Sequence, residues 1–240
     1  MTRKPTRSGA RRSTTASAPP VAGTPREKII AAFMALLAGK SIETIGLAEV
    51  AERADVSLAD LRNEFSSTLA ILAAHAKELD RQVLAGDSDM EEEDARERLF
   101  DVVMRRLELL APHKEAVRSL LRSARRDPPL ALALNAMTVR SQQWMLTAAG
   151  IGASGPKGMV RAQGMALLFA NVLRTWVDDD EDQTKTLAAL DTQLARGQRF
   201  SGLLDDLFRI PQAACAFRER LRSARRSVQR DRDEGDRATV

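Results

Sequence analysis

The chain has 240 residues and a formal net charge of +4; charged residues make up 29% of it and aromatic residues only 4%. A single cysteine, Cys215, excludes an internal disulfide framework and indicates a reducing compartment, which we take to be the cytoplasm. No apolar run reaches the roughly 20 residues that cross a bilayer, and the basic N-terminal region lacks the apolar segment of a secretory signal, so we expect no membrane insertion.

Positive charge is concentrated toward both ends of the chain. Residues 1–24 are rich in Pro, Ser, Thr and Ala and contain five cations and no acid, which predicts a disordered basic arm. Residues 211–240 carry eight arginines against five acids and are a predicted basic tail. Such tails bind polyanions or only keep a chain soluble, and both interpretations stay open here.

Helix signals begin directly after the arm. Thr24 is a good N-cap, Pro25 suits the first helical position, and Gly39 marks the predicted helix end. The inner face of this helix consists of apolar residues at helical spacing, namely Ile29, Ile30, Phe33, Met34 and Leu37.

Two short helices are predicted next, separated by a break at residues 54–56. Leu47, Val50 and Ala51 share one face of the first of them. Two short helices joined by a turn of three or four residues form a helix-turn-helix unit. The second helix of such a unit normally lies in the major groove of DNA.

The second short helix has a strong start signal. Ser57 is followed three residues later by Asp60, which is the spacing of a capping box. The positions of Leu58, Leu61 and Phe65 predict its buried face.

Longer helical segments fill the rest of the chain. Ser66 or Ser67 caps the next one, and the predicted bounds are Thr68 to Ala85, Glu91 to Leu110, Pro112 to about Arg126, Pro128 to Ala149, Met159 to Val177, Gln183 to Gln198 and Leu203 to Phe208. We expect a loop at residues 150–158 and an acidic break at residues 178–182. No alternating run of β-branched residues occurs, so the predicted fold is all-α.

The segment from Arg26 to Leu84 resembles the DNA-binding domain of TetR-family transcriptional regulators. The matching residues are REKIIAA at 26–32, AEVAERA at 48–54, then Val56, Ser57, Leu61 and Phe65. The resemblance implies a helix-turn-helix DNA-binding head at residues 25–85. It also implies a larger ligand-binding and dimerisation body at residues 86–210.

The resemblance further implies a double-stranded DNA operator as partner. The residues expected to face it are Thr44, Ser57, Leu58, Ala59, Arg62 and Asn63. Asn63 would pair with adenine, and Arg62 with guanine or phosphate.

The chain departs from the family pattern in its charges. The family usually has Lys-Gly-Thr after Val-Ser, where this chain has Leu-Ala-Asp at 58–60. An aromatic residue, a histidine and a lysine are replaced by Arg62, Glu64 and Thr68. Residues 41–68 contain two cations against six acids, so the expected phosphate contacts are altered or lost.

For the body, the resemblance implies a small-molecule pocket and a two-fold dimer. Large adaptable side chains are the candidate pocket residues for a small apolar ligand, Met104, Met137, Arg140, Trp144, Met145 and Phe169, with Gln142, Gln143 and Asn171 as further polar candidates. Ordinary core packing is the alternative for each. The last two body helices would form a four-helix bundle in a homodimer through Val160, Leu167, Leu168, Leu187, Leu190 and Leu194.

A second resemblance leaves the function open. Residues 176–191, with WVDDD at 176–180, are similar to the C-terminal part of the lipid-binding accessory proteins of ubiquinone biosynthesis, which share the TetR fold. The first hypothesis is therefore a cytoplasmic bacterial repressor released by a ligand. The alternative is a lipid- or isoprenoid-binding protein with a degenerate head, and a third is a scaffold whose basic tail binds nucleic acid nonspecifically.

We predict neither an enzyme nor a cofactor or metal site. The run GIGASG at 150–155 spells GxGxxG, but it follows a predicted helix where a dinucleotide site needs a strand, so we interpret it as an interhelical loop. His75 and His113 lack the spacing of zinc ligands. A Walker loop, a nucleophile elbow and an HExxH motif are all missing from the sequence.

Overall fold

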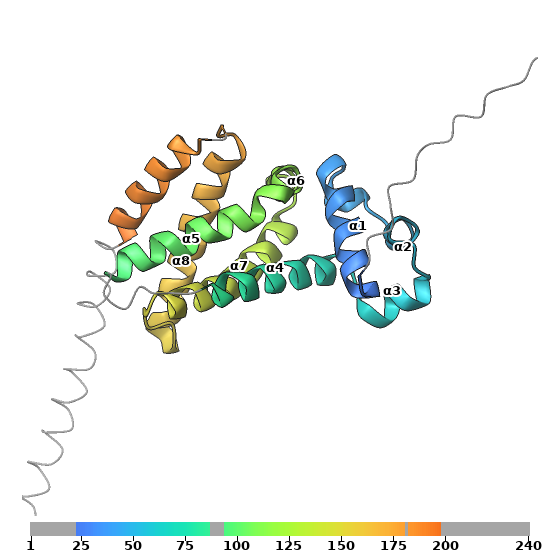
Figure 1. Cartoon of the computed structure of the whole chain (residues 1–240), viewed down its shortest axis with the longest axis horizontal. Coiled ribbons are helices and arrows are strands. Elements are labelled where there is room, and N and C mark those ends of the chain that lie inside the picture. The colour runs from blue at the N-terminus through green and yellow to red at the C-terminus, as the bar shows by residue number, and fades with distance from the viewer. Residues whose placement is uncertain (1–22, 87–93, 181, 198–240) are drawn as a thin grey trace, which may run out of the picture.

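The computed structural model describes residues 23–86, 94–180 and 182–197, and within these ranges the secondary structure is helical, without a β-strand (Figure 1). The predicted all-α fold is therefore confirmed. The predicted helix at 203–208, the basic tail and nearly all of the N-terminal arm lie outside the described residues.

Three helices and a short 3₁₀ turn form the head, namely α1 (Pro25–Gly39), η1 (Ile42–Thr44), α2 (Leu47–Ala54) and α3 (Leu58–Glu64). Side-chain caps define two of the starts, because Thr24 with Glu27 and Ser57 with Asp60 each form a capping box. Asp55 adopts a left-handed φ of 54° between α2 and α3 and so redirects the chain into α3. The helix-turn-helix pair is thus present with the predicted break.

Two details of the head differ from expectation. Gly39 is the last residue of α1, but the cap residue is Lys40 in an extended conformation, so no left-handed glycine ends this helix. Leu58 is 57% exposed, and the prediction that it joins Leu61 and Phe65 in a buried face is wrong. The reason is that α3 buries its other side, through those two residues, in the core of the head.

Helix α4 (Thr68–Ala85) has its predicted bounds and belongs to both parts of the molecule. Its first half packs in the head core through Ile71 and Leu72, and its second half packs in the body through Leu79 and Val83. Figure 1 shows it running from the head into the body. Any displacement of α4 therefore changes the contacts of both parts.

The body consists of α5 (Ala95–Leu110), η2 (Ala111–His113), α6 (Lys114–Ala124), α7 (Pro128–Ala148), α8 (Gly155–Val177) and a helical segment at 184–197. Pro112 lies inside η2, so α6 begins two residues later than predicted. Helix α8 begins at Gly155, four residues earlier than predicted. A Cβ on Gly158 would lie 2.0 Å from the carbonyl carbon of Ala153, so the loop packs against the first turn only because this residue is glycine.

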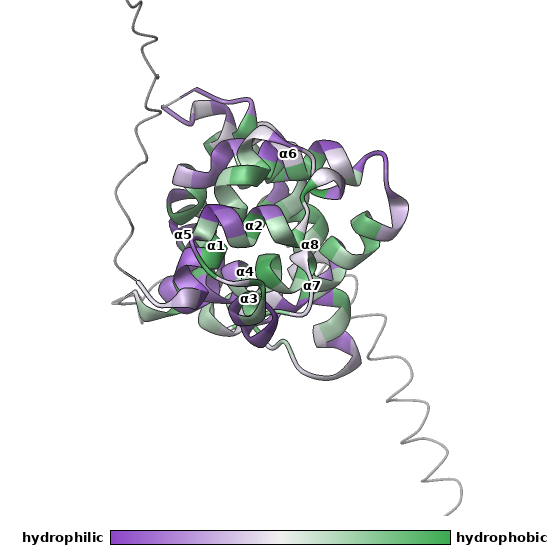
Figure 2. Ribbon diagram, turned by 90° about the vertical axis from the view of Figure 1, so that its right-hand side faces the viewer, coloured by the Kyte–Doolittle hydropathy of each residue, from purple (hydrophilic) through white to green (hydrophobic). Residues whose placement is uncertain are grey.

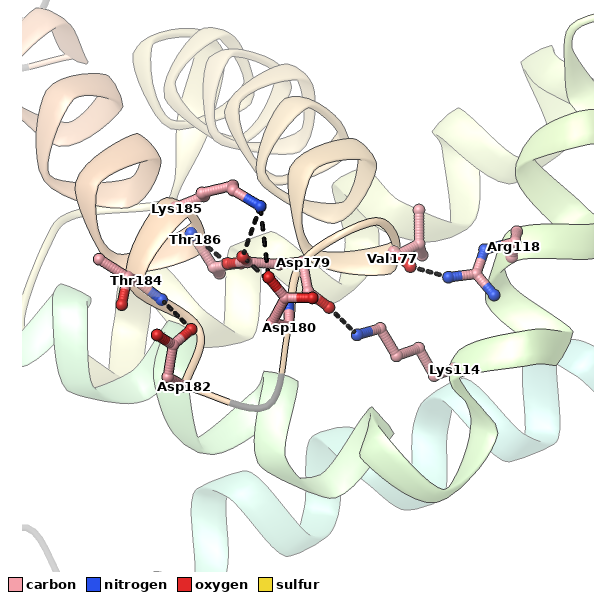
Figure 3. A network of polar contacts seen from close by, with 9 residues as sticks. All are labelled: Lys114, Arg118, Val177, Asp179, Asp180, Asp182, Thr184, Lys185 and Thr186. Atoms are coloured by element: carbon pink, nitrogen blue, oxygen red, sulfur yellow. Dashed lines mark hydrogen bonds and ion pairs between the residues drawn. The ribbon is translucent and has the colours of Figure 1, made fainter.

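Helix α6 connects the head to the far end of α8. The Ser119 hydroxyl donates a hydrogen bond to the Lys40 carbonyl at 2.6 Å, and the Ser123 hydroxyl donates to the Glu43 carboxylate at 3.1 Å. Near the start of α6, Lys114 donates to the Asp179 carbonyl at 2.6 Å (Figure 3). The helices carry hydrophobic and hydrophilic sides, as Figure 2 shows with the head toward the viewer.

The acidic segment at 178–182 is a structured turn in its described residues. The Asp179 side chain is buried, and its Oδ2 accepts hydrogen bonds from the amide and the hydroxyl of Thr186, each at 2.7 Å (Figure 3). These hydrogen bonds hold the pKa of the Asp179 carboxyl below its usual value. The interpretation of this segment as a simple break missed its role in starting the 184–197 helix.

Candidate nucleic-acid interface and ligand cavity

The outer side of α3 is exposed to solvent. The residues predicted to face DNA there are all exposed, namely Ser57, Leu58, Ala59, Arg62 and Asn63. Leu61 and Phe65 hold the inner side with 2% and 4% exposure. The structure therefore brings five of the six predicted DNA-facing residues onto one short surface, and Leu58 is the one large exposed apolar residue in α1, α2 and α3.

Thr44, the sixth predicted residue, lies on η1 before α2. It is exposed, and its hydroxyl donates to the Ser41 carbonyl at 2.8 Å. The N-cap of α2 is Gly46, which supplies no side-chain hydrogen bond. The start of α2 therefore has backbone N–H groups without a side-chain cap, which is an arrangement that suits an anion.

Several acids of the head have partners within the chain. Glu49 pairs with Lys40, Glu64 pairs with Arg26 at 3.4 Å, and Asp60 serves in the capping box of α3. Residues 23–86 nevertheless hold nine acids against seven cations. The structure thus reduces the number of unpaired acids near α3 without making the head basic.

A hollow between α3 and α4 gathers three cations, of which sequence analysis proposed Arg62 for DNA contact and missed Arg26 and Lys77. Arg62 and Asn63 of α3 line it together with Arg26 of α1 and Lys77 of α4. Lys77 lies on the same face of α4 as Ala70 and Ala74, which also line the hollow. In the sequence, this face could have been recognised from two small residues that precede a lysine at helical spacing. These three cations are the strongest candidates for phosphate contacts in the described head.

A half-open cavity of about 690 Å³ lies in the body between the start of α5, the end of α7, α8 and residues 193–197. Its size is that of a small-molecule site. Buried leucines and a methionine form its floor, Leu99, Leu146, Met165, Leu168 and Leu194, and polar residues lie around them.

The six predicted pocket residues do not line this cavity. Met104 and Phe169 pack in the main body core, Met137 against the head core, and Met145 in a small cluster with Val83 and Val102. Arg140 is exposed, and Trp144 is 59% exposed. The prediction of one shared pocket is wrong for these six, because α7 turns Arg140 and Trp144 outward while the others fill separate cores.

Two of the further polar residues that sequence analysis considered for the pocket, Asn171 and Gln142, lie at or near the cavity. Asn171 lines the cavity. Gln142 is fully buried, and neither atom of its amide has a hydrogen-bond partner. It precedes Leu146, which lines the cavity, by one helical turn, so the two residues share one face of α7.

The predicted dimer residues divide into two groups. Val160, Leu167 and Leu187 are exposed large apolar residues, as a docking face requires. Leu168, Leu190 and Leu194 are buried within the described chain, where α8 packs on the 184–197 helix. The second group therefore serves the fold of one chain, and the first remains available to a second copy.

The two histidines, far apart in sequence, touch in the structure. The rings of His75 on α4 and His113 on η2 meet edge to face with centroids 4.7 Å apart. Burial, followed by the nearby His113 and Arg106, lowers the pKa of His75 to about 4. No group of three or more metal-binding side chains occurs in the part of the chain that the structure describes.

The glycine run lies between α7 and α8, as predicted, but the loop ends at residue 154 and Gly155 already begins α8, so it is shorter than the predicted loop at 150–158. Gly150 and Gly155 have φ of 72° and 70°, in the left-handed region that favours glycine.

Among the described helices, none combines the length and apolarity needed to cross a membrane.

Comparisons with known proteins identify the fold. The chain matches no model of a known protein family and no curated protein. Solved structures do match. A TetR transcriptional regulator from Nitrosomonas europaea shares 20% identity with a TM-score of 0.57, covering 73% of this chain and 99% of that one.

Two further regulators give the same result. One from a Rhodococcus species shares 18% identity with a TM-score of 0.52, covering 72% of this chain and 95% of that one. A TetR-family protein from Syntrophomonas wolfei shares 16% identity with a TM-score of 0.53, covering 74% and 94%. The chain therefore has the fold of TetR-type transcriptional regulators, as its helix-turn-helix sequence predicted.

Proposed function

We propose that this protein is a ligand-responsive transcription regulator that binds operator DNA as a cytoplasmic homodimer, acts as a repressor and is released by a small apolar ligand. The observation that carries the proposal is the geometry of α3. Its inner side is fixed by Leu61 and Phe65, and its outer side presents Arg62 and Asn63 to solvent. Arginine and asparagine are the side chains that most often read guanine and adenine in the major groove.

Phosphate contacts follow from the cations beside α3. Arg26, Arg62 and Lys77 line one hollow, and the uncapped start of α2 at Gly46 adds backbone N–H groups. Phosphate neutralisation supplies most nonspecific affinity for DNA. A head with nine acids and few free cations should therefore bind weakly to random DNA and depend on base contacts for its affinity.

The body supports the dimer and ligand parts of the proposal. Val160 and Leu167 of α8 and Leu187 of the following helix expose large apolar side chains on adjacent elements. A two-fold axis beside them would bury the same patch on both copies. A ligand that prefers one of two body arrangements would shift the separation of the two heads through α4, because α4 packs in both cores.

The test is a binding assay with the promoter fragment beside the protein's own gene, titrated with salt. The full-length protein is expected to retain one fragment at low salt. Asn63→Ala should weaken specific binding by about 1–3 kcal/mol and relax sequence preference. Lys77→Ala should weaken binding to all sequences and lower the salt slope by about one.

Arg140→Ala is the matched control, because Arg140 is an exposed arginine of the body helix α7 and does not line the hollow beside α3. It should leave DNA binding unchanged. A folded dimer that ignores every fragment at low salt would refute the regulator proposal. Loss of all DNA binding on removal of residues 211–240, with no sequence preference beforehand, would instead select the nonspecific scaffold.

A second candidate is a lipid- or isoprenoid-binding accessory protein with a degenerate head. The observation that favours it is the acidic character of the head, in which Glu49 forms an ion pair with Lys40 and Glu64 forms one with Arg26. It predicts co-purified lipid in native mass spectrometry together with indifference to DNA. Sequence-specific retention of a promoter fragment would reject it.

A further inference from the structure

On its C-terminal side the described chain ends at Gly197, at the edge of the body cavity. The last turn of the 184–197 helix lines the cavity through Gln193, Leu194, Arg196 and Gly197. The chain after Gly197 therefore continues from the rim of the cavity. Residues 198 and 199 can span at most about 11 Å, so this short connection keeps Phe200 near the rim.

The sequence directly after Gly197 has the apolar pattern of an amphipathic helix. Its large apolar residues occupy positions i, i+3, i+4, i+7 and i+8, namely Phe200, Leu203, Leu204, Leu207 and Phe208. A serine, a glycine and two aspartates fill the positions between them. Isolated helices this short are unstable in water, so such a stripe requires an apolar surface that covers it.

The body cavity offers an apolar surface beside the rim from which the chain continues. Its floor includes Leu146 and Met165. A Cβ on Gly164, in the wall, would meet no heavy atom within 4 Å. The space beside Gly164 is therefore open to side chains from another segment.

We propose that residues 200–208 of the same chain dock in this cavity as an amphipathic helix, with the apolar stripe against the floor and the two aspartates toward solvent. The inference goes beyond the proposed function and does not depend on DNA binding. Residues 200–208 then close the cavity in the absence of ligand. An apolar ligand enters this site only by displacing them.

Composition and position favour this occupant over three others. Residues 87–93 also adjoin the cavity, because Asp94 lies in the lining, but they contain five acids and Met90 as their one apolar residue. A second copy of the chain covers the exposed Val160 and Leu167, whereas the buried floor behind them calls for side chains that enter the cavity. A free ligand competes with a segment whose short connection gives it an effective concentration in about the millimolar range.

Disulfide scanning in the full-length chain tests the docking. Cys215, the single native cysteine, is replaced by serine, and Gly164→Cys places one thiol in the cavity wall. The second cysteine is placed in turn at five positions of the segment, namely Leu203, Leu204, Asp205, Asp206 and Leu207. A disulfide requires Cα atoms within about 7 Å, so the two aspartate positions, on the other side of the helix, are matched controls.

At the fastest of the leucine positions, the intrachain disulfide is expected to form about tenfold faster than at either aspartate position. Non-reducing electrophoresis separates intrachain from interchain products. Equal rates at all five positions, or no intrachain product at any of them, overturn the proposal. An interchain product at the leucine positions also overturns it, because the occupant would then be the segment of a second copy.

Binding of an apolar dye gives a measurement that needs no disulfide. If residues 200–208 fill the cavity about nine-tenths of the time, they weaken the binding of neutral N-phenyl-1-naphthylamine about tenfold. Leu203→Asp combined with Leu207→Asp in the full-length chain should therefore raise the dye affinity about tenfold. Asp206→Asn, the matched change on the polar side, should leave it unchanged. Adding Gly164→Leu to the double variant should abolish the gain by filling the cavity.

Dye affinity that is equal in the wild type and the double variant overturns the proposal, as does a gain that survives Gly164→Leu. Light scattering records the oligomeric state of each variant, and where that state changes the disulfide scan decides alone. The promoter assay is run in parallel. Protein that ignores DNA but forms the leucine-specific disulfides refutes the regulator function alone, whereas specific DNA binding with equal disulfide rates refutes the docking alone.

Discussion

In the head and the connecting helix, three of the four helices α1–α4 begin with a side-chain cap, whereas among α5–α8 of the body only α7 does. Buried polar atoms without partners show the same contrast. Within the described residues they occur on His75, Arg106, Gln142 and Gln183, all in the body or in the part of α4 that faces it.

The contrast in capping and in unpaired buried groups indicates which part of the molecule can gain new contacts. A head in which two of the three helix starts are capped and several acids have internal partners behaves as a rigid unit that presents α3. A body with unpaired buried groups, an open cavity and exposed apolar side chains retains capacity for further contacts. Binding energy from a ligand or a second copy is therefore most readily gained in the body and transmitted to the head through α4.

The largest expected effect contrasts one ion pair in each part. Asp80 and Arg106 pair in the body with side chains 14% and 7% exposed, and Asp80 also accepts from Ser141 at 2.6 Å. Asp80→Ala leaves a buried guanidinium without its partner and should lower the free energy of unfolding by about 3–5 kcal/mol.

Glu64→Ala in the head is the matched change, because the Arg26–Glu64 pair is exposed and should contribute less than about 1 kcal/mol. Urea unfolding followed by circular dichroism measures both. Equal losses in the two variants would show that head and body do not differ in this respect.

Acid should destabilise the body through His75. The unfolded chain takes up a proton on this residue near pH 6.5, whereas burial holds the folded pKa at about 4. The unfolded state therefore binds more protons between these values, and stability falls as pH decreases from 6.5 to 4, by at most about 3 kcal/mol.

His75→Leu should remove this part of the acid sensitivity, measured as the difference between wild-type and variant unfolding free energies at pH 7 and pH 4.5. His113→Leu is the control, because His113 is less deeply buried and should change the slope less. A variant with the same pH slope as the wild type would exclude His75 as its cause.

An apolar replacement of Gln142 should stabilise the protein. Both amide atoms of this fully buried side chain lack partners, and an unpaired buried polar group costs about 1–3 kcal/mol. Gln142→Leu keeps the volume and removes that cost, so urea unfolding should shift upward. A destabilised variant would mean that the amide is satisfied in solution, and the contrast with the head would weaken.

The head could be predicted closely because its signals are local. Thr24, Ser57 and Asp60 fix helix starts through residues three positions away, and Leu61 with Phe65 fixes the inner side of α3. Leu58 was assigned to the buried face because its spacing fits a helix, and only the tertiary packing of α3 shows that it is exposed.

The body could be predicted only in outline. Helix α7 has nearly its predicted bounds, whereas α5 begins at Ala95, four residues later than predicted. Which large side chains share a cavity depends on how the body helices rotate against one another. Trp144 and Met145 are neighbours in sequence, yet one is exposed and the other fully buried. The contact of His75 with His113 likewise depends on long-range packing that no spacing rule contains.

The smallest expected effects test the caps of the helix-turn-helix itself. Ser57→Ala removes the hydroxyl that accepts from the Asp60 amide, while the Ser57 amide can still donate to the Asp60 carboxylate, and should cost about 1 kcal/mol. Gly46→Ser adds a cap to α2, where φ is −85° and a Cβ meets no atom within 4 Å, and should gain only a few tenths of a kcal/mol. Both changes in stability can be measured as shifts of the thermal midpoint. The DNA affinity of the Gly46→Ser variant then shows whether the N–H groups at the start of α2 also bind phosphate. If the bare start of α2 binds phosphate, Gly46→Ser should stabilise the fold while weakening DNA binding, whereas a cap with no role in binding would change the first quantity alone.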